Sequence, residues 1–304
     1  MREPPQSRRL GDGRLHLHDG PIDLIIEAFG ELQAVEAAYA AAGRRFATIL
    51  DELCTELALL RAPSSPGGPL MEGRVAHRMA GAVAPFRERR FLTPMAAVAG
   101  AVAEEILAAM TAAATLERAY VNNGGDIALH LSPRAKFTIG MVERPDRPSL
   151  FGRATITERD RVRGVATSGW RGRSFSLGVA DAVTVVASSA AIADAAATLI
   201  ANAVDIPGHP AILRAPARDV DPQSDLGDRL VTIDVGALTS EEIDVALSSG
   251  AIEAELWRRA GAIEAAALRL GEGSRLVGGE ANLYKVASRA PFLGNEKKAR
   301  HAVG

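Results

Sequence analysis

The spacing of apolar residues predicts a short strand and then a long helix in the first sixty residues. Residues 14–18, Arg-Leu-His-Leu-His, alternate polar and apolar, which predicts a half-buried strand with Leu15 and Leu17 on one face and both histidines on the other. From about 22 to 61, apolar residues recur every three or four positions, as in an amphipathic helix. Residues 1–13 lack either pattern and are expected to form a loose basic tail.

Loop and cap signals separate that segment from the middle of the chain. Residues 63–69 are rich in proline and glycine and predict a loop. A helix is expected at 72–83. Thr93 then suits a helix N-cap and Pro94 the first helical position, so an Ala-rich helix should run from there to about 116.

A run of short strands is expected next. The strand candidates are 118–122, 126–131, 136–143, 151–157, 162–166 and 182–187. Ser188 or Ser189 then suits the cap of a helix at 190–203, and residues 205–228 indicate an irregular loop with room for one strand.

The last part of the chain is expected to be helical. Thr239 to Glu242 fits a capping box, and a further helix is expected from about 250 to 270, ending at Gly271. Helices around a run of hairpin-spaced strands indicate an α+β fold with a mostly antiparallel sheet. We expect one compact unit made of an N-terminal strand and helical arm (1–62), a core (70–230), and C-terminal helices with a tail (231–304).

Composition narrows the classes of function. The chain has 304 residues, 47% of them hydrophobic and 24% charged, so it can bury a sizeable core. A net charge of −2 excludes a global electrostatic footprint for nucleic acid. The single cysteine, Cys54, excludes an intramolecular disulfide and a multi-cysteine metal site. Its spacing from Leu50, Leu53 and Leu57 predicts a buried, inert thiol.

Nothing in the first twenty residues predicts secretion, because they carry charges and two prolines and no apolar run. The most apolar stretches, 95–116 and 183–204, contain Glu104, Glu105 and Asp194, so we interpret them as buried helices and strands rather than membrane spans. A cytoplasmic protein with no membrane partner is expected. The Ala-rich helix faces are compatible with a homodimer.

The turn Asn122-Asn123-Gly124-Gly125-Asp126 is the first candidate site. Asn and Gly tolerate positive φ, so successive backbone N–H groups can point into one concavity that binds an anion. Asp126 would then orient a ligand or hold water on a metal. The alternative is a plain two-residue hairpin, which an Asn-Gly pair favours strongly.

Asp194 and Thr198 are the second candidate. Residues four apart project from one face of a helix, about a turn from each other. Carboxylate and hydroxyl oxygens suit Mg²⁺ or Ca²⁺. The alternative is an exposed aspartate near the first helical turn, favoured by the helix dipole, beside a neutral threonine.

Two further positions give weaker signals. Ser168 follows a strand and is interpreted as a hydrogen-bonding partner of a ligand, because no nucleophile-elbow motif surrounds it. His16 and His18 share a strand face beside Asp19, which would allow a metal site, although two exposed histidines are the commoner arrangement.

These motifs, in this order, resemble the ApbE-like superfamily of flavin transferases between residues 93 and 204. The segments that carry the resemblance are Thr93-Pro-Met-Ala at the start of a helix reaching Glu104, Tyr120-Val-Asn-Asn-Gly-Gly-Asp-Ile127, Ala166-Thr-Ser-Gly169, and Val183-Thr-Val-Val-Ala187 leading to Ala193-Asp-Ala-Ala-Ala-Thr198. Asp19-Gly-Pro-Ile-Asp-Leu24 makes the chain similar to the uncharacterised, UPF-type branch of that superfamily.

The resemblance implies cofactors and a set of site residues. Enzymes of the superfamily use flavin adenine dinucleotide (FAD) and Mg²⁺ to attach the flavin mononucleotide (FMN) portion to a threonine of a target protein. The metal ligands fall on Asp194 and Thr198. The ligand-binding residues implied by the matching motifs are Thr93, Asn122, Asn123, Gly124, Gly125, Asp126, Ser168 and Gly169.

Two departures from the superfamily pattern change the expected function. Ala99-Gly100-Ala101 stands where the transferases carry Lys-Gly-Tyr, and the short interval 171–178 lacks the histidine and Asp-Pro of the corresponding segment. The expectation is therefore a protein that binds a phosphorylated, nucleotide or flavin-like ligand with Mg²⁺, without standard FMN transfer. A non-catalytic binding or partner protein is one alternative, and an enzyme of a one-carbon or coenzyme pathway acting on a small metabolite is another. Retained flavin transfer to an acceptor protein is a further hypothesis. No catalytic residue is identified.

Overall fold

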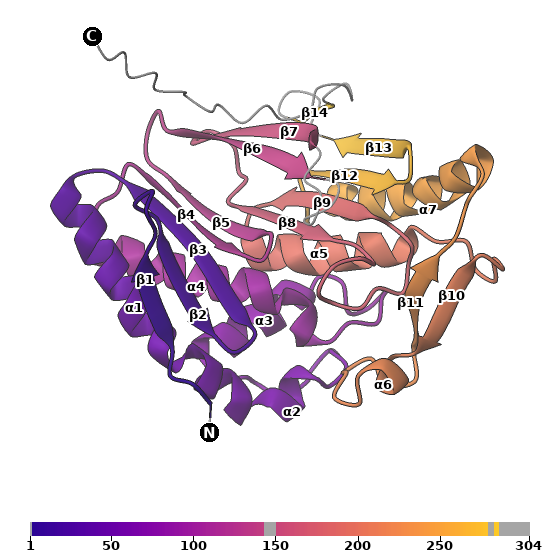
Figure 1. Ribbon diagram of the computed structural model, residues 1–304, viewed down its shortest axis with the longest axis horizontal. Coiled ribbons are helices and arrows are strands. Elements are labelled where there is room, and N and C mark those ends of the chain that lie inside the picture. Colours follow the sequence, from indigo (N-terminus) through magenta and orange to yellow (C-terminus); the bar gives the residue numbers. More distant parts are fainter. Residues whose placement is uncertain (1, 143–149, 279–282, 286–304) are drawn as a thin grey trace, which may run out of the picture.

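A nine-stranded sheet organises the part of the chain that the structure describes (Figure 1). The structure is a computed structural model that describes residues 2–142, 150–278 and 283–285. Neighbouring strands of this sheet run antiparallel throughout. In spatial order the strands are β1 (Gln6–Arg9), β2 (Leu15–Asp19), β3 (Ile22–Phe29), β4 (Arg118–Asn123), β5 (Asp126–Leu131), β8 (Gly164–Ser168), β9 (Ala182–Ala187), β12 (Ala265–Leu270) and β13 (Gly273–Gly278).

The helices are α1 (Leu32–Thr55), α2 (Leu57–Leu60), α3 (Arg74–Val83), the 3₁₀ turn η1 (Pro94–Ala97) with α4 (Val98–Ala113), α5 (Ala190–Ala203), α6 (Ala217–Val220) and α7 (Ser240–Arg259). Helices α1, α4, α5 and α7 pack on one face of the large sheet, whereas the short α6 lies beside the strand at residues 212–216 (Figure 1). Helix α4 lies at the centre, in contact with α1, α3, α5, β4 and β5. Helix α5 packs on β8 and β9, and α7 packs on β12 and β13.

Smaller sheets complete the fold. Strands β6 (Lys136–Val142), β7 (Leu150–Thr157) and β14 (Leu283–Lys285) form a three-stranded sheet. Ile156 of β7 packs with Val165 and Ala267 of the large sheet in a second apolar cluster, so this small sheet covers the face away from the helices. Strands β10 (Ile212–Pro216) and β11 (Leu230–Val235) pair as a separate hairpin.

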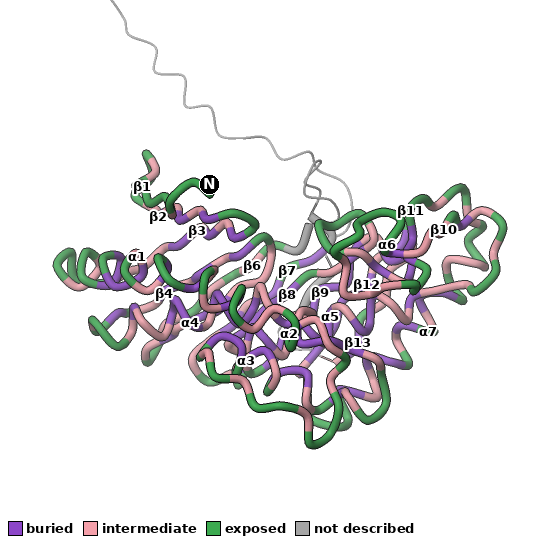
Figure 2. Tube along the Cα trace, turned by 90° about the horizontal axis from the view of Figure 1, so that it is seen from below, coloured by how far each residue is buried: buried purple, intermediate pink, exposed green. Residues whose placement is uncertain are grey.

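The main core lies between the large sheet and its helices, where the buried stretches of Figure 2 gather. Strands β2 and β3 show how the sequence dictates this, because their residues alternate between buried and partly exposed. Leu17 and Leu24 are fully buried on the inner face, and Ile49 and Phe46 of α1 belong to the same core. The predicted faces of β2 are thereby confirmed, as is the α+β fold class.

The N-terminal prediction was wrong in two places. Residues 1–13 are not all loose, because Gln6–Arg9 pairs with β2 as an exposed edge strand. Its residues carry no apolar alternation, so backbone pairing alone defines it. The expected helix at 22–61 begins only at Leu32, since Ile22–Phe29 forms β3. There, alternate residues from Ile22 to Ile26 face the core, a period of two that outweighs the helical spacing.

Three later predictions also require correction. The separate helix expected from about 250 to 270 does not form, because residues up to Arg259 continue the helix that Thr239 caps and 265–270 form β12, which a turn at Gly271 (φ +51°) joins to β13. Thr93 precedes a 3₁₀ turn without capping it, and its hydroxyl donates to the Asp225 carboxylate instead. Cys54 is exposed, because it lies next to Leu53 around the helix and turns away from the buried stripe. The other expected strands and helices form near their predicted bounds, and Ser189 and Thr239 act as N-caps.

The expected division into three segments and the expected absence of a membrane span remain predictions. Strand β3 pairs with β4, so the N-terminal segment and the expected core share one sheet, but the division into segments is not otherwise tested. The stretch Pro94–Ala113 is long and apolar enough, by these two measures alone, to cross a membrane. Half of its apolar window is buried inside the protein, as is typical of a core helix. The end of the chain from 286 lies outside the described residues.

Candidate functional site

The glycine-rich turn is a two-residue hairpin between β4 and β5. Asn123 pairs with Asp126 across it, and Gly124 and Gly125 have φ of +66° and +118°. Residues other than glycine rarely adopt such angles, which accounts for the Gly-Gly pair. The Gly125 N–H donates to Asn122 Oδ1 at 2.9 Å, so one amide that an anion nest would need is already satisfied within the turn.

Side chains of this hairpin tie it to two other elements. Asn123 is buried, and its Nδ2 donates to the Ala99 carbonyl oxygen at 3.2 Å, in the first turn of α4. Asp126 Oδ1 accepts from the Thr167 N–H of β8 at 3.3 Å. The turn is thus held between the start of α4 and the end of β8, and it aims a carboxylate into that junction.

Helices α4 and α5 meet at the same junction, in close contact near the N-terminus of each. Asp194 Oδ2 of α5 accepts from the Gly100 N–H of α4 at 3.0 Å. In return, Glu104 Oε1 of α4 accepts from the Ala191 N–H of α5 at 2.9 Å. The first N–H groups of a helix have no partner within it, so each carboxylate satisfies a free donor of the other helix. We call this arrangement the reciprocal cap.

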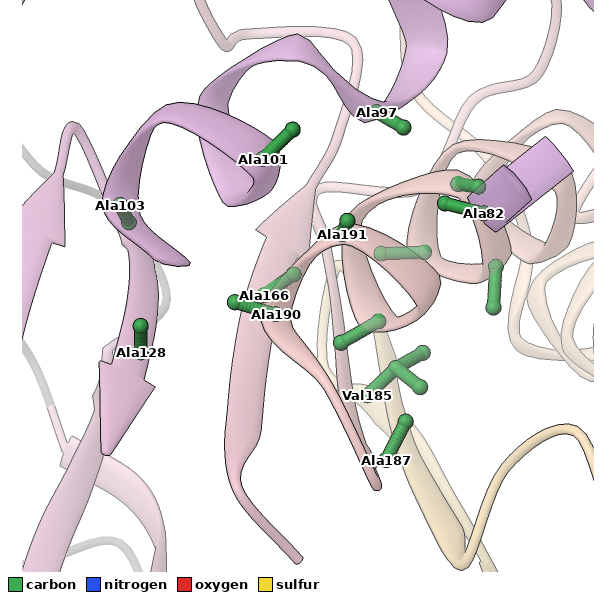
Figure 3. Close-up of a cluster of buried hydrophobic side chains, with 14 of the residues drawn as sticks. Ala82, Ala97, Ala101, Ala103, Ala128, Ala166, Val185, Ala187, Ala190 and Ala191 are labelled. Carbon is green, nitrogen blue, oxygen red and sulfur yellow. The ribbon is translucent and has the colours of Figure 1, made fainter. Parts of the chain in front are cut away.

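Small residues allow the reciprocal cap to form. A Cβ on Gly100 would lie 2.3 Å from the Ala190 carbonyl oxygen, far inside contact distance. Figure 3 shows the alanines at this contact, with Ala97 and Ala101 on the η1–α4 segment and Ala190 and Ala191 at the start of α5. The alanine-rich composition of both helices therefore reflects how closely their backbones approach.

Asp126 and Asp194 form an electrostatically coupled pair. Burial raises the pKa of Asp194 to about 7, although hydrogen bonds from the Gly100 and Ala99 amides oppose the shift. Burial and the nearby charge of Asp194 raise the pKa of Asp126 well above its ordinary value, against the hydrogen bond from the Thr167 amide. Both residues keep part of their surface exposed. Two carboxylates that repel each other in one partly buried place are stabilised by a bound proton or cation.

The donor set fits a hard divalent cation only in part. Asp194 uses Oδ2 for the Gly100 amide and also accepts from the Ala99 amide, and Asp126 uses Oδ1 for the Thr167 amide, which leaves Oδ2. Thr198 follows one turn later on α5 and is partly exposed. Within the described ranges, no group of three or more His, Cys, Asp or Glu side chains is arranged to hold a metal ion. A cation here would need oxygens from water or a ligand, as Mg²⁺ commonly takes.

The remaining predicted site residues are distributed unevenly. Ser168 ends β8, one residue after Thr167, and Gly169 approaches the Asp181 carbonyl oxygen so closely that a Cβ would lie 2.3 Å from it. The contacts of Thr93 run to Asp225 and not to the turn. The structure therefore brings together the turn, Asp194 and the end of β8, while the predicted ligand and metal roles stay predictions.

Sequence reasoning missed two contributors to the site. The backbone amides of Ala99 and Gly100 donate to Asp194. In the sequence, the only sign of this contact is the run of small residues, Ala99-Gly100-Ala101, at the position of the transferases' Lys-Gly-Tyr motif. Arg173 is exposed, its Nη2 donates to the Pro21 carbonyl oxygen at 2.8 Å, and its Nη1 lies 3.5 Å from where a Gly124 Cβ would be. It brings a cation to the rim of the turn. The rings of His16 and His18, which were weighed as a metal site beside Asp19, both contact Asp23 Oδ2 at 3.1 Å. Both side chains are partly exposed.

The sequence comparison defines the family. A family model described as AbpE bacteria matches residues 7–282. The chain belongs to this family. Its relatives include a UPF0280 protein of Methanopyrus kandleri, 45% identical over 129 residues, in a match covering 42% of this chain and 48% of that protein. A UPF0280 protein of Methanocaldococcus jannaschii is 41% identical over 115 residues, covering 36% and 44%. The chain thus spans about half the length of the curated relatives it matches.

A solved structure is also similar to this AbpE-family chain. The apo form of the flavinyl transferase ApbE of Pseudomonas stutzeri aligns with a TM-score of 0.41 and 13% identity, covering 91% of this chain and 96% of that one. At that TM-score the similarity does not establish a shared fold or function, so the fold assignment depends on the architecture described above.

Proposed function

We propose that the Asp126–Asp194 pair binds a divalent cation, with Mg²⁺ the first choice, together with the phosphates of a nucleotide ligand of the FAD type. The observation that carries this proposal is the gathering of two partly buried carboxylates between the glycine turn and the start of α4. A cation relieves their mutual repulsion, and phosphate oxygens complete its coordination. Family membership and the motif resemblance support a flavin nucleotide as the first ligand to test.

Charge at the rim supports a phosphorylated ligand. Arg173 lies next to the turn and is exposed, so its guanidinium is available to an anion. The start of α4 adds the positive end of a helix dipole. Standard FMN transfer is not proposed, because the lysine and histidine motifs of the transferases have no counterpart here. A cytoplasmic location is part of the proposal.

The test is a thermal-shift series on the full chain at pH 8, with FAD, FMN or ADP and with Mg²⁺ or EDTA. A ligand that binds only the folded state adds about 2.7 kcal/mol to the free energy of unfolding at a hundredfold excess over Kd, and Tm rises as a result. We expect a rise that requires Mg²⁺ and that Asp194→Asn and Asp126→Asn abolish. Asp12→Asn, at an exposed carboxylate in another turn, is the matched control and should respond like the wild type.

Two results would contradict the proposal. One is a Tm rise that is the same with EDTA, and the other is a Mg²⁺-dependent rise that survives in Asp194→Asn. Mass spectrometry of the small molecules after incubation then separates the alternatives. A new product would identify an enzyme acting on the nucleotide, and an unchanged ligand would identify a binding protein.

A further inference from the structure

A hollow that includes neither carboxylate of the Asp126–Asp194 pair lies between the N-terminal segment and the end of β2. It has a volume of about 240 Å³ and is lined by Arg2, Glu3, Pro4, Gln6 and the stretch from His18 to Gly20. It includes the start of the Asp19-Gly-Pro segment, which the proposed function leaves without a role.

Asp19 is the unusual group in this hollow. The residue is 2% exposed, yet neither carboxylate oxygen accepts a hydrogen bond within the described structure. Within the described residues, its one close charged contact is Arg2, whose Nε lies 3.2 Å from Oδ1. Buried carboxylates are stable only when paired and hydrogen-bonded, so this one leaves Oδ2 with an unmet demand for a donor.

The charges around Asp19 do not balance. Arg2 is shared, because its Nη1 also lies 2.9 Å from Asp51 of α1. Glu3 lines the same hollow, and in the described part of the chain it accepts only from the neutral amide of Gln6. Among the described residues, one guanidinium is therefore shared by two carboxylates, and a third carboxylate, Glu3, lines the same hollow. A further cation would satisfy Asp19 Oδ2 and correct the excess of negative charge.

Size and geometry indicate the class of that cation. No set of three or more His, Cys, Asp or Glu side chains in the described residues is arranged for a metal ion, and His18 already directs Nδ1 at Asp23. The volume of about 240 Å³ far exceeds that of one water, whose share of the liquid is about 30 Å³. We propose that this hollow binds a small organic cation, whose ammonium or guanidinium group donates to Asp19 Oδ2.

Arg2 gives the proposal a distinctive consequence. Its guanidinium occupies the side of Asp19 that faces Oδ1, so it competes with a ligand cation for the same carboxylate. Removing the Arg2 charge should therefore tighten binding of an organic cation. A carboxylate whose only role is to anchor the N-terminal segment would show no such gain.

The experiment is isothermal titration of the full chain with agmatine and with putrescine, and 1-butanol as the uncharged probe. We expect agmatine and putrescine to bind and 1-butanol not to bind. Asp19→Asn keeps the shape and removes the charge, and it should weaken binding about tenfold or more, the effect of losing one buried charge-assisted hydrogen bond. Arg2→Gln should strengthen binding several-fold. Asp12→Asn, an exposed carboxylate near β2, should leave it unchanged.

The proposal is overturned if neither amine binds the wild type, if Asp19→Asn binds as tightly, or if Mn²⁺ or Zn²⁺ binds through Asp19 in place of the amines. Circular dichroism establishes whether Asp19→Asn folds. If it does not, the comparison of Arg2→Gln with the wild type decides, since equal or weaker amine binding in that variant overturns the proposal. None of these readouts involves the Asp126–Asp194 pair, so failure here leaves the proposed function untouched.

Discussion

Asp194 has two structural roles at once, since it caps α4 through Gly100 and repels Asp126. Its folded-state pKa of about 7 lies above the ordinary unfolded value of about 3.9. The folded protein therefore binds the extra proton between those values. The stability that the raised pKa of Asp194 contributes is fully present below pH 4 and is lost as the pH rises through 7.

We expect Asp194→Asn to remove much of that pH dependence, because the asparagine oxygen can still accept from the Gly100 amide while carrying no charge. In urea unfolding with EDTA, the variant should gain about 1–3 kcal/mol relative to wild type between pH 5 and pH 8, a range reduced for partial solvent exposure. Asp12→Asn should follow the wild type. An identical pH dependence in Asp194→Asn and wild type would show that the carboxylate titrates normally.

Residue identity was a good guide to the carboxylates and a poor one to their partners. Asp126, Asp194 and the glycine turn stand out in the sequence because glycine and spaced acidic side chains are locally recognisable. The amides that face Asp194 belong to Ala99 and Gly100, which carry no chemical signal of their own. Backbone donors at a helix start become visible only once the packing of α4 on α5 is known.

At the scale of elements, the reciprocal cap joins α4 and α5 into one unit whose contact depends on Gly100. Gly100→Ala places a Cβ 2.3 Å from the Ala190 carbonyl oxygen, so the helices must separate and both capping hydrogen bonds lengthen. We expect a loss of about 2–4 kcal/mol of unfolding free energy, in the range of overpacked cores and broken buried contacts.

Gly81→Ala is the matched control for that substitution. It lies within α3 with no atom inside 4 Å of the added Cβ, so the higher helix propensity of alanine should raise stability by about 0.5–1 kcal/mol. Chemical denaturation of both variants measures the difference. Equal small effects at the two positions would mean that the helices are less tightly packed than the structure indicates.

Element type could be predicted where one period dominates a segment. The expected strands at 118–122 and 182–187 and the helix at 190–203 formed as predicted. The helix predictions for residues 22–31 and 265–270 were wrong because both helical and strand spacing fit such short apolar runs. Only pairing with a neighbouring strand determines which structure forms. Strand β1 carries no apolar pattern, so pairing with β2 alone produces it.

At the scale of the whole molecule, the large sheet ends in β1 on one side and β13 on the other. An open strand edge offers unpaired backbone groups to another chain, and charged side chains oppose such pairing. The β1 edge carries Arg8 and Arg9, both exposed. We expect Arg8→Val with Arg9→Val to increase self-association in sedimentation velocity, by edge-to-edge pairing.

Arg44→Val with Arg89→Val removes the same charge from exposed positions outside the strands and should not increase self-association. If both double variants associate alike, net charge and not the strand edge controls solubility. The wild-type run in the same series also measures whether the chain is a homodimer, which remains a prediction.

The reciprocal cap also bears on what binding costs. Association loses free energy whenever flexible groups must be ordered around a ligand. Here Asp194 is already fixed by an α4 amide, α5 is fixed by Glu104, and Asp126 is fixed by the backbone of β8. The carboxylates are thus preorganised by the protein's own architecture, so a cation entering between them would displace protons and water while leaving the helices where they are.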